Sequence, residues 1–250
     1  MVVGIIPARY SSTRFPGKPL CDIAGKPMIY HTYFSAKKSN LVDRLIVATD
    51  DYRIVEKCVQ FGMEYVLTPD NIQTGSDRIA FVAKEIVGAK IIVNIQGDEP
   101  FIPSQMIDEA IEPLIYDSKI EVSTLIKKIT DVEDIKSASV VKVVFDQHNF
   151  ALYFSRSPIP FVRDSTSFNE SLKLNCYYKH IGLYVFRTDA LFKFTRLPQT
   201  DLERFEKLEQ LRMLEHGMKI KVVETELDSL SIDTPDDLKK ALIHYSSILS

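Results

Sequence analysis

The sequence is poor in cysteine, with three among 250 residues. Cys21, Cys58 and Cys176 lie far apart, and no two of them form a Cys-x-x-Cys pair. This pattern argues against a disulfide framework and against a zinc site built from thiolates, and it is typical of a reducing compartment. We therefore expect a cytoplasmic protein.

Long apolar runs are missing as well, and neither sign of charge is in large excess. The apolar start, residues 2–6, is too short for a membrane span or a signal-peptide core, and no basic region precedes it. The net charge of −3 gives no footprint for nucleic acid or for an anionic membrane. We expect neither partner, and any anion-binding site has to be local.

The chain also lacks internal repeats, low-complexity tracts and segments with the composition of a linker. Hydrophobic residues make up 45% and charged residues 26%, which is ordinary for a globular protein. A chain of this length can bury a sizeable core. We therefore expect one domain over residues 1–250 with an elaborated second half.

Short β-branched runs alternate with helical patterns through the first half. The predicted strands are 2–6, 44–49, 64–67 and 91–95, and the predicted helices are 27–38, 52–61, 76–87 and 103–116. Strands that are apolar throughout and separated by helices indicate an α/β fold with a parallel sheet covered on both faces. Ligands of such sheets bind outside the carboxyl ends of the strands.

The second half is more mixed. Its predicted strands, some of them antiparallel, are 121–129, 140–145, 151–155, 182–187 and 219–224, and its predicted helices are 207–216 and 234–245. Residues 161–178 are polar without clear periodicity, which predicts an irregular excursion. Gly217 is a typical end for the first of these helices.

The segment GIIPARYSSTRFPGKPL, residues 4–20, joins the first strand to a stiff loop with three cations, Arg9, Arg14 and Lys18. It matches neither Gly-x-Gly-x-x-Gly nor Gly-x-x-x-x-Gly-Lys-Ser/Thr. Arginine and lysine after a first strand can bind phosphate. The alternative is a solvated loop whose cations face water.

Acidic residues follow the strand at 91–95. In VNIQGDEPF, Asp98 and Glu99 stand where the chain leaves the sheet, and a carboxylate there is a reasonable Mg²⁺ ligand for a nucleotide. The alternative is a turn stabilised by aspartate. Asp233 in SIDTPDD is either a second metal carboxylate or the N-cap of the last helix.

The remaining candidates are weak when each is taken alone. TGSDRIA, residues 74–80, opens a helix, where Gly75 permits close backbone approach and Arg78 either reads a base edge or forms an ion pair. Single residues such as Arg156, His180 and Tyr184, or the Glu209–Gln210 pair, are most often structural or solvated.

Taken together, these segments resemble the 3-deoxy-manno-octulosonate cytidylyltransferase family over nearly the whole chain. The matching segments, in order, are IIPARYSSTRFPGKPL, VATDD, TGSDRIA, VNIQGDEPF, ALYFSRSPIPF, HIGLYVFR, LEQLRMLEHG and IDTPDDL. The resemblance implies a GT-A-like, Rossmann-related nucleotidyltransferase with a mostly parallel central sheet and an added α+β portion. It also implies a homodimer, with CTP bound mainly by 1–120 and sugar binding and dimerisation mainly in 121–250.

The family's activity is transfer of CMP from CTP to the anomeric hydroxyl of 3-deoxy-D-manno-octulosonate (Kdo), which yields CMP-Kdo and pyrophosphate for lipopolysaccharide biosynthesis. The resemblance implies Mg²⁺ as cofactor. The hydroxyl would attack the α-phosphorus in line, so that catalysis consists mostly of positioning and electrostatics.

Site residues carry over where the motifs match. The CTP-binding residues would be Pro7, Ala8, Arg9, Arg14, Lys18, Gln73, Gly75, Ser76 and Arg78; the metal ligands Asp98 and Asp233; and the sugar-binding residues Arg156, His180, Tyr184, Glu209 and Gln210. Arg9, Lys18 and Asp98 would be catalytic, with the two cations stabilising the leaving pyrophosphate. Arg156 would bind the Kdo carboxylate and the other four sugar-side residues its hydroxyls.

Two departures from the family pattern concern selectivity. GSDR stands where GTER is usual, and Phe161 stands where a tryptophan often follows PIP, in a chain that has no tryptophan. A cytidylyltransferase for 8-amino-Kdo or sialic acid therefore stays an alternative. A non-catalytic nucleotide-binding scaffold of the same fold is a further one, although Lys18, Asp98 and Asp233 are all present.

Overall fold

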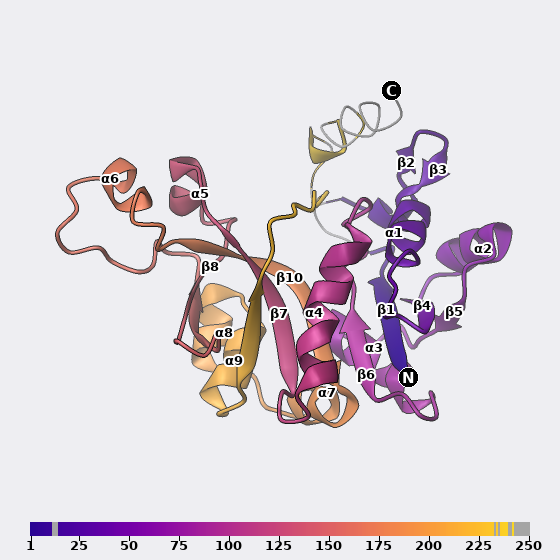
Figure 1. The fold of residues 1–250 in the computed structure, drawn as a ribbon. Coiled ribbons are helices and arrows are strands. Elements are labelled where there is room, and N and C mark those ends of the chain that lie inside the picture. Colours follow the sequence, from indigo (N-terminus) through magenta and orange to yellow (C-terminus); the bar gives the residue numbers. More distant parts are fainter. Residues whose placement is uncertain (12–14, 233, 235, 240–241, 243–250) are drawn as a thin grey trace. The chain divides into compact units, whose positions relative to one another are not determined.

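The computed structural model describes residues 1–11, 15–232, 234, 236–239 and 242 (Figure 1). The chain forms two compact units: unit 1 comprises Met1–Asp108 and Asp228–Ser250, and unit 2 comprises Glu109–Leu227. The sequence predicted a single domain whose halves meet near residue 120. The last segment of the chain returns to the unit formed by the first.

Unit 1 contains the expected parallel sheet. Its strands are β1 (Val2–Ala8), β4 (Arg44–Thr49), β5 (Tyr65–Leu67) and β6 (Ile91–Asn94), in the order β6-β1-β4-β5. Every neighbouring pair is parallel. The inner strands β1 and β4 are buried along almost their whole length, as apolar strands covered on both faces should be. The predicted α/β class is confirmed.

The helices of unit 1 have bounds within three residues of the predicted ones. They are α1 (Met28–Ala36), α2 (Tyr52–Phe61), α3 (Gly75–Lys84) and the start of α4 (Ser104–Tyr116). Asp51 caps α2 by accepting from the backbone N–H of Arg53, and Gly62 ends it with φ +65°. Thr74 caps α3 by accepting from the N–H of Asp77. A short helix, η1 (Lys18–Leu20), and two short strands, β2 (Asp22–Ile23) and β3 (Lys26–Pro27), lie between β1 and α1.

Unit 2 is built on a mixed sheet. Its strands are β7 (Val122–Lys128), β8 (Lys142–Phe145), β9 (Ala151–Ser155), β10 (Tyr178–Arg187) and β11 (Ile220–Glu224). β7 pairs antiparallel with β10 and parallel with β11. β8 pairs antiparallel with both β10 and β9. The expected mixture of strand directions is thus present, and unit 2 is the added α+β portion.

The helices of unit 2 correct two expectations. They are α5 (Val132–Lys136), α6 (Phe168–Leu172), α7 (Thr188–Phe194), α8 (Asp201–Glu206) and α9 (Gln210–Glu215), of which α6 lies inside the excursion at 161–178 (Figure 1). The predicted helix 207–216 begins too early. A capping box of Thr200 and Glu203 starts α8, and Lys207 ends it with φ 54°, so α9 begins at Gln210.

The last predicted helix lies partly outside the described residues. Within them, 236–239 are helical, and the Thr234 hydroxyl accepts from the backbone N–H of Asp237 as a cap. Among the described residues no helix has the length and apolarity needed to span a membrane.

Candidate functional site

A cavity of about 440 Å³ lies in unit 1 where the carboxyl end of β1 meets the loop after β6 and the start of α3. We call it the β1 cavity. Among the residues predicted to bind CTP or metal, those lining it are Pro7, Ala8, Arg9, Lys18, Gly75 and Asp98. The structure therefore brings three sequence motifs, the opening loop, TGSDR and QGDEP, to one concave surface. The N-terminus of α3 adds positive partial charge there.

Two glycines lie against Pro7, where these motifs meet. A Cβ built on Gly97 would lie 2.9 Å from the carbonyl oxygen of Pro7, closer than real Cβ atoms approach backbone. A Cβ on Gly75 would lie 3.6 Å from the proline ring, at ordinary contact distance. Gly97 is thus required for the loop that carries Asp98 to pack against the end of β1.

The opening loop is closed at its base by Tyr10 and Gly17. The N–H of Gly17 donates to the carbonyl of Tyr10 at 2.9 Å. Gly17 has φ +72°, and a Cβ there would lie 3.2 Å from the tyrosine ring. This glycine turns the chain into η1, which starts at Lys18. The positive φ of Gly17 thus serves this turn.

Lys18 and Asp98 form an ion pair on the wall of the β1 cavity. The lysine Nζ lies 2.7 Å from Oδ2 of Asp98, and the side chains are 14% and 27% exposed. The carbonyl of Asp98 accepts from the N–H of Ile232 at 2.9 Å, so the chain reaches this loop one residue before Asp233. Asp233 and Arg14 themselves lie outside the described residues.

Glu99, next to Asp98, differs from it in environment. Its side chain is buried, and burial raises its pKa to about 7. Asp98 is therefore the better placed of the two to hold a cation. A partly exposed carboxylate is a hard oxygen donor that suits Mg²⁺, which takes few protein ligands and completes its shell with phosphate and water. No group of three or more His, Cys, Asp or Glu side chains that could hold a metal ion occurs among the described residues.

Three of the residues predicted to bind CTP, Gln73, Ser76 and Arg78, do not line the β1 cavity. Arg78 is fully buried; it donates to the Asp50 carboxylate at 2.5 Å and to the hydroxyl of Thr68. It joins α3 to the segment that follows β4. Gln73 is exposed and donates to the carbonyl of Asn71.

In unit 2, an irregularity of β10 brings His180 and Tyr184 together. The pairing with β7 shifts between Ile181 and Tyr184, so that two residues of β10 have no register partner. The Thr124 hydroxyl holds this bulge, because it lies 2.8 Å from the carbonyl oxygen of Leu183 and 2.9 Å from Nε2 of His180. The rings of His180 and Tyr184 are 5.3 Å apart between centroids.

His180 is neutral in this setting. Burial lowers its pKa to about 3. Since the single proton of the Thr124 hydroxyl is directed at the β10 carbonyls, Nε2 of His180 carries the proton of their shared bond. Nδ1 is then an acceptor.

Two buried polar atoms of candidate residues in unit 2 lack hydrogen-bond partners among the described residues. They are the Tyr184 hydroxyl and Nε2 of Gln210. Burial, together with the charge of Glu209, raises the pKa of Tyr184 well above its ordinary value, so the phenol is protonated. Buried polar groups without partners are rare in folded proteins and often mark a ligand site. We call these residues, with His180, the sugar-side cluster, after the role that the sequence predicts for them.

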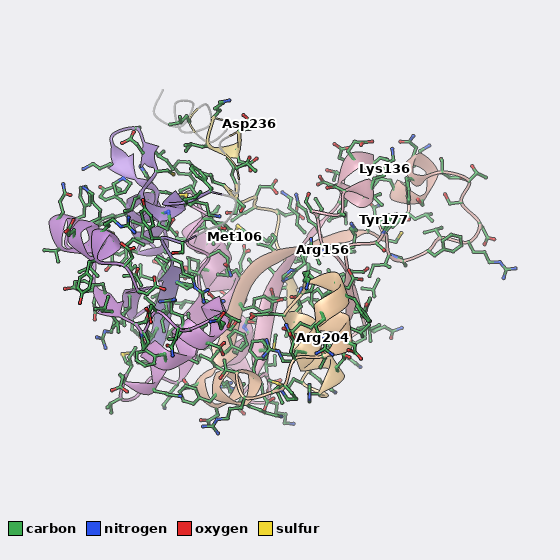
Figure 2. All side chains as sticks on the ribbon, turned by 180° about the vertical axis from the view of Figure 1, so that it is seen from behind. Met106, Lys136, Arg156, Tyr177, Arg204 and Asp236 are labelled. Atoms are coloured by element: carbon green, nitrogen blue, oxygen red, sulfur yellow. The ribbon has the colours of Figure 1, made fainter. Side chains whose placement is uncertain are left out.

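Arg156 makes different contacts. It follows β9 and lies beside the α8–α9 pair, where it is labelled in Figure 2. Its guanidinium donates to the backbone carbonyls of Glu206, at 2.7 Å, and Ala138, at 2.8 Å. In the structure this side chain therefore connects backbone segments.

Sequence reasoning did not select several residues that the structure places in these sites. They are Ser11, Pro19, Met28, Gln96 and Gly97 at the β1 cavity and Thr124 in unit 2. Gln96 and Gly97 stand inside a motif that was recognised as a unit, so their position next to Asp98 was an available signal. Thr124 offers only a polar residue within an apolar strand, which is common.

Comparison with known proteins gives a consistent result. A family model described as Cytidylyltransferase matches residues 3–220. The chain is 51% identical over 245 residues to the 3-deoxy-manno-octulosonate cytidylyltransferase of Trichlorobacter lovleyi, covering 96% of each protein. It is 52% identical over 246 residues to the protein of the same name from Geobacter sulfurreducens, covering 96% of this chain and 98% of that one.

Solved structures agree. CMP:2-keto-3-deoxy-manno-octonic acid synthetase complexed with CTP superposes with a TM-score of 0.91 at 37% identity, covering 98% of each chain. A cytidylyltransferase from Leptospira borgpetersenii superposes with a TM-score of 0.66 at 20% identity, which speaks for a shared fold. The predicted nucleotidyltransferase fold is confirmed.

Proposed function

We propose that this chain, which belongs to the cytidylyltransferase family, transfers CMP from CTP to Kdo. It belongs within that family to the group whose members are named 3-deoxy-manno-octulosonate cytidylyltransferases. The products are CMP-Kdo and pyrophosphate. The observation that carries the proposal is the β1 cavity, where the motifs shared with the family meet around Lys18 and Asp98.

The β1 cavity suits the triphosphate of CTP. A triphosphate brings about four negative charges, which cations have to offset. Arg9 and Lys18 line the cavity, and they would stabilise the charge that develops on pyrophosphate as it leaves. The start of α3 contributes its dipole. Little covalent chemistry is left to the protein, so these residues act by binding and orienting the phosphates.

Mg²⁺ is part of the proposal. Asp98, with its partly exposed carboxylate, would hold the ion, and Asp233 is the second candidate from the sequence. When bound there, the ion would neutralise phosphate charge and lower the pKa of the attacking sugar hydroxyl.

The sugar-side cluster suits a polyhydroxylated substrate. The Tyr184 hydroxyl donates, Nδ1 of His180 accepts, and the amide of Gln210 donates, so neutral groups of both kinds are available for sugar hydroxyls. Glu209 is an acceptor at the same cluster. Arg156 is the candidate for the sugar carboxylate, through guanidinium N–H groups beyond those given to Glu206 and Ala138.

One experiment tests the substrate directly. The protein is incubated with CTP and Mg²⁺ and, separately, with Kdo, 8-amino-Kdo and sialic acid, and pyrophosphate release is measured. We expect release with Kdo. Faster release with 8-amino-Kdo or sialic acid would show that this sugar acid, and not Kdo, is the preferred substrate. No release with any of the three would support the non-catalytic scaffold. Omission of Mg²⁺ tests the metal.

A homodimer is the proposed assembly, formed through unit 2. Phe161 is 88% exposed beside a pocket of about 490 Å³ lined by Pro158, Pro160, Val162 and Tyr177. A second copy would cover this apolar surface. Light scattering should give twice the chain mass for the wild type and the chain mass for Phe161→Asp. Val87→Asp, at a site 96% exposed in unit 1, is the control.

The cellular context belongs to the proposal too. The free cysteines Cys21, Cys58 and Cys176 suit the cytoplasm. CMP-Kdo would serve there as the activated sugar donor for lipopolysaccharide.

A further inference from the structure

Lys142 has a fully buried side chain, which is uncommon for lysine because an unpartnered buried charge is costly. It begins β8, and its Nζ donates to the carbonyls of Ser137 at 2.8 Å, Val140 at 2.7 Å and Arg156 at 2.6 Å. An ammonium has three N–H donors, so all of them are used. Lys142 thus ties the turn before β8 to the residue that follows β9.

Glu206, the last residue of α8, holds the same segment from the other side. Its Oε1 accepts from the Ser155 hydroxyl at 2.7 Å, and its Oε2 accepts from the N–H of Arg156 at 2.9 Å. Both backbone polar groups of Arg156 are therefore bound by charged side chains, the N–H by Glu206 and the carbonyl by Lys142. Charge-assisted hydrogen bonds of this kind are stronger than neutral ones.

The guanidinium of Arg156 extends the network to the end of α8. Nε donates to the carbonyl of Glu206 at 2.7 Å, and Nη2 lies 3.5 Å from the carbonyl oxygen of Lys207. Carbonyls at a helix C-terminus carry negative partial charge and attract a cation. Lys207, with φ 54°, then leads the chain toward Glu209 and Gln210.

Arg212 secures the same turn from α9. Its Nη2 lies 2.9 Å from Oε1 of Glu203 and 3.7 Å from Oε1 of Glu209. Its guanidinium also packs over the ring of Phe194, 4.8 Å from the centroid. The α8–α9 turn, residues 206–210, is thus held by one arginine on each side.

We infer that Lys142 and Glu206 are positioning residues for the sugar-acid side. Through Arg156 they fix the α8–α9 turn, and thereby the placement of Glu209 and Gln210. The inference rests on the proposed function, in which those two residues bind the sugar. Because the network lies within unit 2, its loss should weaken binding of the sugar acid and leave binding of CTP in unit 1 unaffected.

Lys142→Met tests this, since it removes the ammonium and keeps an unbranched apolar side chain. We expect the KM for Kdo to rise about 10-fold or more, with the KM for CTP changed less than twofold. Lys221→Met is the matched control, because Lys221 is a partly exposed lysine of unit 2 whose Nζ donates to the carbonyl of His148 and packs over the ring of Phe150, away from Arg156. It should leave both KM values unchanged. A purely structural role of Lys142 would lower the active fraction without changing either KM, and that result would overturn the inference.

Glu206→Gln is the second variant, for the case that Lys142→Met does not fold. It keeps the size of the side chain, removes its charge, and should raise the KM for Kdo about threefold. Hydrogen exchange supplies a readout that needs no turnover: the amides of 207–211 should exchange faster in either variant, while those of β4 keep the wild-type rate. If the wild type turns over none of the sugar acids, the proposed function fails, and the exchange rates still decide the positioning role. Unchanged exchange in 207–211 in a folded variant contradicts it.

Discussion

In unit 1 the site residues carry charge and face a cavity, whereas in unit 2 the sugar-side cluster is largely neutral. Lys18 and Asp98 pair at 2.7 Å and both retain some exposure. His180 has a pKa of about 3, and the pKa of Tyr184 is raised, so each is uncharged at neutral pH. Phosphate needs compensating charge, while sugar hydroxyls need donors and acceptors freed from water. Under the proposed function, the two units would meet these needs by opposite means.

The largest effect is expected when a charge is removed from the β1 cavity of unit 1. Asp98→Asn keeps the shape and removes the charge, so it should lower kcat by about 10²–10³-fold, measured as pyrophosphate release at saturating Mg²⁺. Asp22→Asn, at an exposed aspartate of β2 in the same unit, should retain wild-type rates. Substantial activity of Asp98→Asn would remove Asp98 from the metal site.

The next largest effect is expected on stability, from the packing at the end of β1. Gly97→Ala places a methyl 2.9 Å from the carbonyl oxygen of Pro7 and should lower the free energy of unfolding by about 1–3 kcal/mol. Gly75→Ala, whose methyl would sit 3.6 Å from the proline ring, should change it by less than about 0.5 kcal/mol. Denaturant unfolding measures both. Equal stability of the two variants would contradict the close approach at Gly97.

On the neutral side, Tyr184→Phe should separate activity from stability. The buried Tyr184 hydroxyl has no hydrogen-bond partner among the described residues, so its removal should leave the free energy of unfolding unchanged or higher. The KM for Kdo should rise about 5- to 10-fold. Tyr177→Phe is the matched control: its hydroxyl donates to the buried Ser171 at 3.2 Å. It should lose about 1 kcal/mol of stability with the KM for Kdo unchanged. The reverse pattern would place the ligand site elsewhere.

The last prediction concerns the neutral charge state of His180. Its folded pKa of about 3 lies below the ordinary 6.5, so the unfolded chain binds more protons between these values. Stability from this residue is therefore complete above pH 6.5 and declines as the pH falls. Relative to His180→Asn, the wild type should lose at most about 1.4 kcal/mol per pH unit in that window. Unfolding at pH 7, 6 and 5 measures the difference, and parallel curves would show that His180 takes up its proton as readily in the folded protein as in the unfolded chain.

Prediction from sequence was accurate where the signal is local. The bounds of β4, α2 and β9 agree with the expected 44–49, 52–61 and 151–155, because apolar periodicity and caps such as Asp51 act within a few residues. The predicted start of α9 at residue 207 was wrong, because nothing in the residues around Lys207 reveals that it adopts a left-handed conformation. A capping box seven residues earlier was the missed signal.

The site residues also divide into those that a local motif reveals and those whose role depends on distant partners. The opening loop, QGDEP and HIGLY could be selected as motifs, and the structure brings residues of the first two to one cavity. The burial of Arg78 could not be foreseen, because its partner Asp50 lies 28 residues away in the chain. Nor could the role of Lys142, which depends on a carbonyl 14 residues further on.

The order of strands and helices, the cationic character of the first loop and the family resemblance were determined by the sequence alone, because each rests on residue types at short spacing. The tertiary structure decided which polar groups are paired, buried or left for a ligand. Lys18 meets Asp98 across 80 residues, and His180 meets Thr124 across 56. Charge state and hydrogen bonding depend on such distant neighbours, since burial and partners, not sequence position, set the free energy of a polar group.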